Sequence, residues 1–167
     1  MEIKDILEQV KKSHDFQSWR AEHKEEYLAH IFIMFDGDNL MDKQVGYYSQ
    51  SSNTMTSFTV SDDSVTMIPE AEVFKKPDGN SVGKLDLDSV KIGFDEAVEK
   101  ADGVLKDKYQ TNASKKIYIL QNIEEKDMWN VTLLTQDYST INIRIDASTG
   151  ELIKDEKVNL IDFEKSG

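Results

Sequence analysis

The amino-acid sequence predicts an α+β protein made of two tandem units, each a helical segment followed by an antiparallel β-meander. In each unit the helices are expected to pack on one face of the sheet. Two observations carry this prediction. Apolar residues recur at helical spacing over residues 3–12 and again over 94–109. After each helical segment come short stretches with strand-like patterning, separated by short polar turns, which is typical of a meander.

The first unit begins with two helices. The helix over residues 3–12 has one apolar face, formed by Ile3, Ile6, Leu7 and Val10. A short second helix should follow, with Ser13 or Asp15 as its N-cap. Phe16 and Trp19 lie three residues apart and would anchor this helix to the sheet.

Four strands should complete the first unit, at residues 28–35, 45–50, 55–60 and 65–68. The turn-rich stretch 75–84 marks the boundary between the units. We therefore divide the chain into a first unit (1–76), a linker (77–89) and a second unit (90–167).

The second unit repeats the plan. A helix with Asp95 as N-cap is followed by predicted strands at 117–123, 128–135 and 140–145, and Val158, Leu160 and Ile161 suggest a last strand. Residues 44–74 align without gaps on residues 129–159, which places apolar residues on apolar residues, such as Phe58 on Ile143. This alignment indicates an internal duplication, although identity over the window is close to chance.

Composition limits the function. The 167 residues include 32 acidic and 20 basic side chains, a formal charge of −12. Such a surface repels phosphate backbones and anionic lipids, so we expect neither nucleic acid nor a membrane as partner, and a basic protein or peptide suits the field better. There is no cysteine, which excludes disulfides and thiol nucleophiles. The chain starts without a basic or apolar leader, which predicts a cytoplasmic protein; a secreted protein that has lost its signal peptide is the alternative.

Motifs for catalysis or metal binding are missing from the sequence. His14, His23 and His30 are the only histidines, and their spacing fits no common ligand motif. Residues 36–42 resemble a calcium loop but have Leu40 and Met41 where an oxygen ligand and a glycine are needed. There is no nucleophile elbow and no phosphate-binding loop. We therefore expect no catalytic residue, no metal and no cofactor.

Aromatic residues are the candidate binding residues. Trp19, Tyr47, Tyr48 and Trp129 all lie in amphipathic elements, and such residues often line grooves for a ligand or peptide. Because Tyr47 and Tyr48 are adjacent on a strand, their side chains should point to opposite faces of the sheet. The alternative is that all four residues only fill the core or the ordinary surface.

The second unit resembles a PepSY domain. The stretch from Thr140 to Ile153, a strand that ends in Asp-Ala-Ser-Thr-Gly-Glu before a return strand, is similar to the C-terminal hairpin of that family. Residues 92–101 resemble its leading helix and 128–134 its middle strand. In the turn, Asp146 and Thr149 can bond to the backbone and Gly150 can supply a positive φ. The first unit lacks the glycine turn, so the resemblance there is architectural and the first unit would be a diverged copy.

PepSY domains are not enzymes and are thought to regulate peptidases. The resemblance thus implies a non-enzymatic binding or regulatory module that acts on a protein or peptide partner, such as a peptidase. The first alternative is a small-ligand binder with a pocket between helix and sheet or between the two halves. The second is a structural or assembly component. If the halves differ in role, we expect the first to carry what is particular to this protein.

Overall fold

The computed structural model describes residues 1–73 and 82–160, which contain eight strands and three α-helices. The helices are α1 (Ile3–Lys12), α2 (His14–Glu22) and α3 (Phe94–Asp107), and a short 3-10 turn, η1 (Leu87–Ser89), precedes α3. The first meander consists of β1 (Tyr27–Asp36), β2 (Asn39–Ser49), β3 (Thr54–Val60) and β4 (Val65–Glu72). The second consists of β5 (Ala113–Ile123), β6 (Lys126–Thr135), β7 (Ser139–Asp146) and β8 (Leu152–Asn159).

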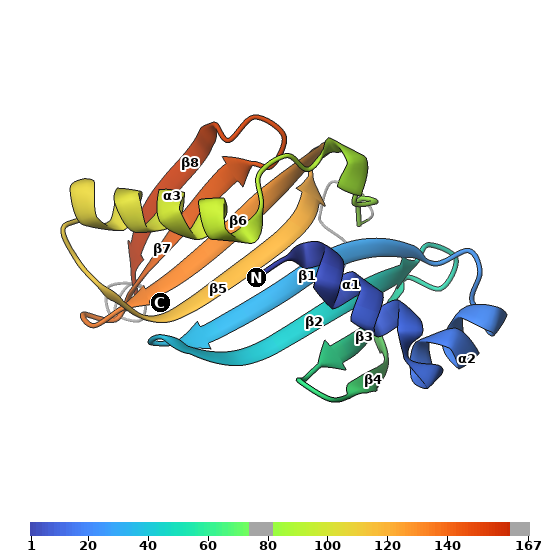
Figure 1. Cartoon of the computed structure of the whole chain (residues 1–167). Helices are drawn as coiled ribbons and strands as arrows, with labels where there is room; N and C mark the ends of the chain where they lie inside the picture. Colours follow the sequence, from blue (N-terminus) through green and yellow to red (C-terminus); the bar gives the residue numbers. More distant parts are fainter. Residues whose placement is uncertain (74–81, 161–167) are drawn as a thin grey trace.

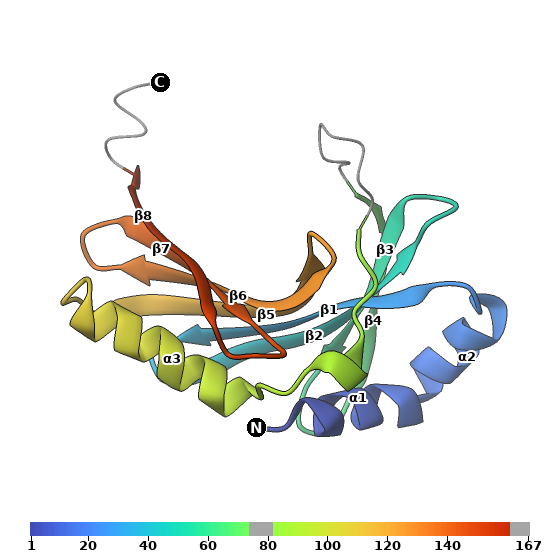
Figure 2. The same ribbon diagram turned by 90° about the horizontal axis from the view of Figure 1, so that it is seen from above.

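The two meanders form one continuous sheet. Its strand order is β4-β3-β2-β1-β5-β6-β7-β8, and every neighbouring pair is antiparallel. The first strand of each meander, β1 and β5, makes the central pair (Figure 1). All three helices lie on the same face of this sheet, which leaves the other face without a helix in the described part of the chain (Figure 2). The predicted α+β class with two tandem meanders is confirmed, and the two expected sheets are one.

Helix boundaries follow from local chemistry, with one correction. Ser13 caps α2, because its hydroxyl accepts a hydrogen bond from the backbone N–H of Phe16 at 3.2 Å. The expectation that Asp95 caps α3 was wrong. The helix begins at Phe94 with Gly93 as N-cap, and Asp95 lies in the first turn, where its charge is favourable beside the positive end of the helix.

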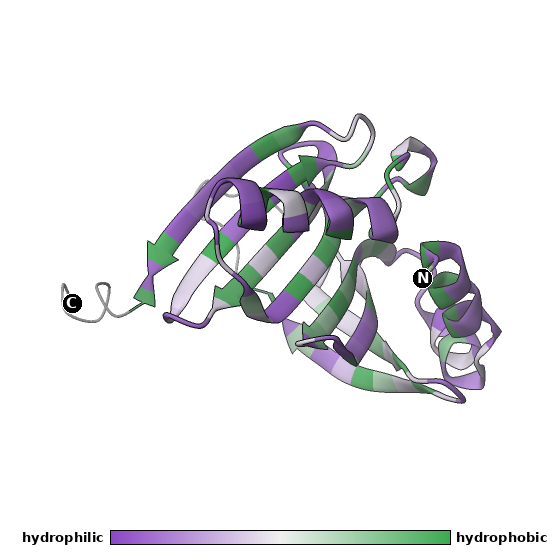
Figure 3. Cartoon of the chain, turned by 60° about the vertical axis from the view of Figure 1, so that its left-hand side comes forward, coloured by the Kyte–Doolittle hydropathy of each residue, from purple (hydrophilic) through white to green (hydrophobic). Residues whose placement is uncertain are grey.

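The core lies between the helices and the sheet. Several strands alternate between apolar and polar residues along their length, and α3 is hydrophilic on the side away from the sheet (Figure 3). Under α2, four aromatic rings pack with centroid separations of 5.3 to 6.1 Å, and they belong to Phe16, Trp19, Tyr47 and Phe58. Under α3, Trp129 is fully buried and its Nε1 donates to the carbonyl of Ile92 at 2.8 Å.

The connection between the meanders is partly built into the core. Leu85 is buried, and its N–H donates to Leu28 O of β1 at 3.0 Å. Asp127, at the start of β6, holds the next residues, because its carboxylate accepts from Ser89 Oγ at 2.6 Å and from Asp86 N at 3.1 Å. Residues 77–81 of the predicted linker lie outside the described residues.

The strand register tests the ungapped alignment of residues 44–74 on residues 129–159. Phe58 and Ile143 both face the helices, as the ungapped alignment requires. The same alignment matches Val45, which faces the helices, with Asn130, which faces the other way. The two meanders therefore correspond element by element, with a small offset between their hairpins. The predicted final strand joins the preceding segment in β8, and Ile161 lies outside the described residues.

Candidate functional site: the open face of the sheet

The face of the sheet without a helix, here called the open face, can be followed by register across the whole sheet. Side chains alternate along a strand, so the neighbours of core residues point to this face. One row of cross-strand neighbours crosses all the strands from β4 to β8: Thr66, Thr59, Gln44, Phe32, Ile119, Asn130, Arg144 and Lys154. This row combines apolar, amide and cationic side chains.

The centre of the open face is an apolar stripe along the β1–β5 pair. Phe32 pairs with Ile119, and Met34 pairs with Ile117 in the next row. All four side chains are half-buried, and the core cluster of the described residues includes none of them. A partner that covers these half-buried side chains would remove their remaining apolar surface from water, which favours binding.

Amide side chains lie beside the stripe on its β6–β7 side. Asn142 Nδ2 donates to Asn130 Oδ1 at 2.8 Å and to the carbonyl of Val131 at 3.1 Å. On the β2 side, Gln44 Nε2 donates to Asp42 Oδ2 at 2.6 Å. These bonds fix the orientation of the amides and leave acceptors and donors at the edge of the apolar stripe.

Arg144 is a cation of the open face that forms no ion pair in the part of the chain that the structure describes. It lies on β7 between Asn130 of β6 and Lys154 of β8. Its Nε is buried and has no hydrogen-bond partner, and within the described residues its guanidinium makes no ion pair. Lys154, by contrast, pairs with Glu156 at 3.1 Å. A half-buried guanidinium whose Nε is unpaired within the described residues is suited to a carboxylate, which can accept two parallel hydrogen bonds from it.

His30 closes one side of the stripe. It pairs with Gly46 of β2, and its ring lies over that glycine so closely that a Cβ built there would be 2.2 Å from His30 Cε1. Burial lowers the pKa of His30 from its usual value, so the ring is neutral at neutral pH. Beyond it, Tyr48 packs on Tyr27 with ring centroids 5.6 Å apart.

The four predicted binding residues lie in packed positions. Trp19, Tyr47, Tyr48 and Trp129 have exposed fractions of 7%, 3%, 1% and 0%. Tyr47 packs in the cluster under α2 and Tyr48 points to the other face, in keeping with their adjacent places on one strand. The structure does not bring the four together at a surface groove, and their contact with a partner stays a prediction.

The Asp146–Gly150 turn has the geometry of a tight Asx turn. Asp146 Oδ1 accepts from Ser148 Oγ at 2.7 Å, from Ser148 N at 2.8 Å and from Thr149 N at 3.1 Å. The Ser148 hydroxyl first, and then these backbone N–H groups, lower the pKa of Asp146. Gly150 has a φ of +81°, and Thr149 Oγ1 accepts from Glu151 N at 3.1 Å.

The histidines and the calcium-like loop do not converge. His14 is the first residue of α2 and is exposed, His23 stacks on Trp19, and His30 lies on β1. Among the described residues, no group of three histidine, aspartate or glutamate side chains could hold a metal ion. Residues 36–39 form the β1–β2 turn, with Gly37 at a φ of +61°.

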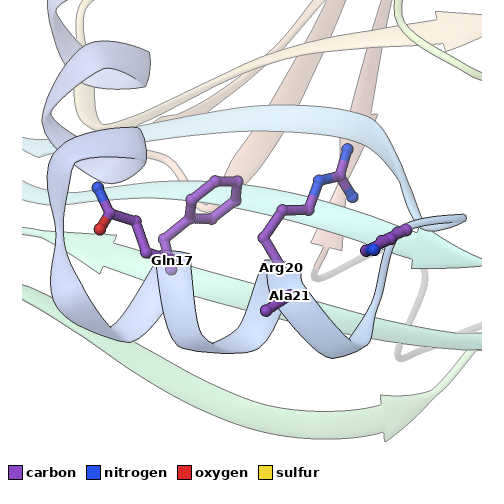
Figure 4. Close-up of a pocket in the computed structure, with 5 residues that line it drawn as sticks. Gln17, Arg20 and Ala21 are labelled. Carbon is purple, nitrogen blue, oxygen red and sulfur yellow. The ribbon is translucent and has the colours of Figure 1, made fainter.

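A hollow of about 490 Å³ runs along α2, where Gln17, Arg20 and Ala21 project from the helix (Figure 4). Arg20 is engaged in the structure, because it donates to the carbonyls of His23 at 3.0 Å and Glu26 at 2.6 Å. Its guanidinium also lies 5.5 Å from the ring centroid of Tyr47. This hollow is lined from one helical segment and is open to solvent, so we do not assign it a ligand.

Comparison with known proteins supports the fold. No family model matches the chain, and no curated protein sequence matches it. A crystal structure from Clostridium difficile 630, of a protein described as a "putative lipoprotein", is similar over 86% of this chain and 90% of that chain. The TM-score is 0.56 and the sequence identity 17%, a level at which the likeness shows the fold alone. The resemblance to PepSY domains therefore stays a hypothesis.

No helix in residues 1–73 or 82–160 is both long enough and apolar enough to cross a bilayer.

The open face was not among the sequence-based candidates, although the sequence contains a signal for it. Residues 31–35 and 117–120 are apolar without alternation. Such runs indicate apolar side chains on both faces of a strand, and both lie on the central pair.

Proposed function

We propose that this chain is a non-enzymatic binding module, PepSY-like in architecture, that holds a segment of a protein or peptide partner on its open face. The observation that carries the proposal is the apolar stripe of Phe32, Met34, Ile117 and Ile119 on a face without a helix. Helices cover one side of the sheet, and a partner would cover the other in the same way, by burying apolar side chains.

The chemistry of the partner follows from the rest of the face. Phe32 and Arg144 lie three strands apart in one row, a separation of about 14 Å at the usual strand spacing. A segment with an apolar side chain on the stripe and a carboxylate at Arg144 would satisfy both. The charge of −12 favours basic groups elsewhere on that partner, because they would speed encounter.

The proposal also covers the location of the protein and the class of its partner. The similarity in fold to a protein described as a lipoprotein favours a location at the cell surface over the cytoplasmic location expected from the sequence. A peptidase partner rests on the PepSY resemblance, and regulation of a peptidase would be the activity.

The proposal is tested with a displayed library of random peptides selected on the wild-type protein. Selected peptides should combine apolar residues with Asp, Glu or a free C-terminal carboxylate. Phe32→Ser should weaken their binding about tenfold or more, because it removes an apolar side chain of the stripe. Arg144→Gln should have an effect of similar size, since a hydrogen bond to a charged group contributes about 1.5–3 kcal/mol. Met67→Ser is the matched control, because Met67 is an exposed apolar residue of the edge strand β4 that pairs with Phe58 and so lies on the helix side of the sheet.

Circular dichroism would establish that each variant is folded before binding is compared. Peptides that bind all three variants as tightly as the wild type would show that the open face is not the site. Sedimentation velocity tests the alternative that the protein is an assembly component. If the wild type self-associates and Phe32→Ser abolishes the association, the partner on the open face is a second copy of this chain.

A further inference from the structure

A pocket on the helix side of the sheet, here called the junction pocket, lies where the two halves of the chain meet. Its volume is about 330 Å³, at the lower end of the range for small-molecule sites. Its lining comes from three elements: Phe35 and Asp38 from the β1–β2 hairpin, Phe94 and Val98 from α3, and Tyr118 from β5. It lies on the opposite side of the sheet from the open face.

Three aromatic rings form the apolar wall. Phe35 and Phe94 stack with centroids 6.0 Å apart and planes 12° apart. Tyr118 meets both edge-on, at 6.3 Å from Phe35 and 5.2 Å from Phe94. This wall is apolar and suits the alkyl part of a ligand.

The hydroxyl of Tyr118 is the polar group of this wall. The residue is 1% exposed, and within residues 1–73 and 82–160 its hydroxyl makes no hydrogen bond. Burial, and then the charge of Asp102, raise the pKa of Tyr118 far above its usual value. Tyr118 and Asp102 both line the pocket. The Tyr118 hydroxyl is not among the sealed, unpaired polar atoms of the described residues, so water or a ligand can reach it and accept its hydrogen bond.

The charges around the pocket are mainly negative. Asp38, Asp95 and Asp102 line it, against one cation, Lys116, which lies 4.0 Å from Asp102. Asp95 is also 3.4 Å from the α-amino group of Met1, a contact that is exposed to solvent. The field inside an aromatic pocket with a carboxylate rim therefore favours a positive ligand.

We propose that the junction pocket binds a primary alkylammonium group. The ammonium would donate hydrogen bonds to the Tyr118 hydroxyl and to the Asp102 carboxylate, and its alkyl chain would lie between Phe94 and Val98. A primary ammonium has three N–H donors, whereas a quaternary one has none and would leave the tyrosine oxygen unsatisfied. The group can belong to a free amine or to a lysine side chain of a peptide, and the two sources present the same chemistry.

The test is titration of the wild-type protein with n-butylammonium, followed by NMR shifts of the pocket residues. A ligand with so few atoms should bind with a Kd on the order of 1–10 mM. Tetramethylammonium and n-butanol should bind much more weakly, because one cannot donate and the other has no charge. An N-acetylated, C-amidated Gly-Lys-Gly peptide then separates the sources: tighter binding than butylammonium would assign the site to lysine side chains, and weaker binding to free amines.

Three variants locate the site. Tyr118→Phe removes only the hydroxyl, and Asp102→Asn removes only the charge; each should weaken butylammonium binding about tenfold or more. Asp107→Asn is the matched control, since it makes the same change on α3 outside the pocket. Absence of saturable binding, or equal binding by all variants and by n-butanol, would overturn the proposal. Because peptide selection on the open face uses none of these residues, the two proposals succeed or fail separately.

Discussion

Gly150 offers a test of the turn that carries the PepSY resemblance. Its φ is +81°, a region that costs an L-residue with a Cβ roughly 1–2 kcal/mol. A Cβ at this position would also lie 3.1 Å from Ile92 Cδ1 and 3.3 Å from Lys100 Cε, closer than ordinary van der Waals contact. Gly150→Ala should therefore lower the free energy of unfolding by about 2 kcal/mol or somewhat more, and Gly150→Val by more still, because a branched side chain resists positive φ.

Two other glycines separate the cost of backbone strain from the cost of steric contact at the new Cβ. Gly37 has a φ of +61°, and a Cβ at that position would have no atom within 4 Å, so Gly37→Ala measures backbone strain alone and should cost about 1 kcal/mol. Gly103 lies within α3 and also has open space around it, so Gly103→Ala should stabilise the protein by about 0.5–1 kcal/mol.

Thermal unfolding followed by circular dichroism measures the series. For a chain of this size 1 kcal/mol shifts Tm by roughly 2–4 °C. We expect Tm to fall by about 4–8 °C for Gly150→Ala and about 2–4 °C for Gly37→Ala, and to rise by about 1–3 °C for Gly103→Ala. An unchanged Tm for Gly150→Ala would refute the assigned turn geometry. A loss no greater than that of Gly37→Ala would show that Ile92 and Lys100 move aside without cost.

Two further predictions concern the open face and the second hairpin. Gly46→Ala should destabilise the protein strongly, because the new Cβ would clash with the His30 ring. Adding His30→Ala should recover most of the lost stability. The measurement is a double-mutant cycle in urea, and additive effects of the two substitutions would contradict the prediction. The Ser148 hydroxyl and the turn N–H groups hold the folded pKa of Asp146 below its unfolded value of about 3.9. Their stabilisation is thus present above about pH 4 and is lost as the pH falls through the folded pKa. Urea midpoints measured from neutral to acid pH should fall less steeply in Asp146→Asn, and parallel curves would argue against the turn as the cause.

Helices and strands were predictable wherever the information is local. Ile6, Leu7 and Val10 recur at helical spacing and are all buried in α1. The start of α3 was missed by a residue or two because a distant contact decides it. The N–H groups of Lys91 and Ile92 both donate to Ala147 O, at 2.8 and 2.9 Å, and this fixes how the chain approaches the helix. An aspartate prefers the N-cap position, but that preference is weaker than the two hydrogen bonds to Ala147, the first residue after β7.

The union of the two meanders was not predictable from local pattern. Pairing of β1 with β5 depends on which strand edges meet, and alternation specifies faces rather than edges. The candidate sites were missed for the same reason. Large aromatics attract attention in a sequence, yet Trp129 and Tyr47 fill the core because aromatic side chains bury a large apolar area. Arg144 has no distinctive neighbour in the sequence, and its lack of an ion pair within the described residues is visible only when the strands are assembled.

The row across the open face also changes which half is expected to give specificity. Outward from its central pair, the next positions are amides on both sides, Gln44 and Asn130. One strand further, the two sides differ, with Thr59 on β3 and Arg144 on β7. A duplicated scaffold would present the same chemistry twice, so a partner that binds only the stripe and the amides could lie across the face in two opposite directions. The single cation at that position would remove the ambiguity, because a carboxylate can satisfy it in one orientation only. In this proposal the second half, which resembles PepSY more closely, also sets the polarity of binding, and Arg144→Gln would lose orientation as well as affinity.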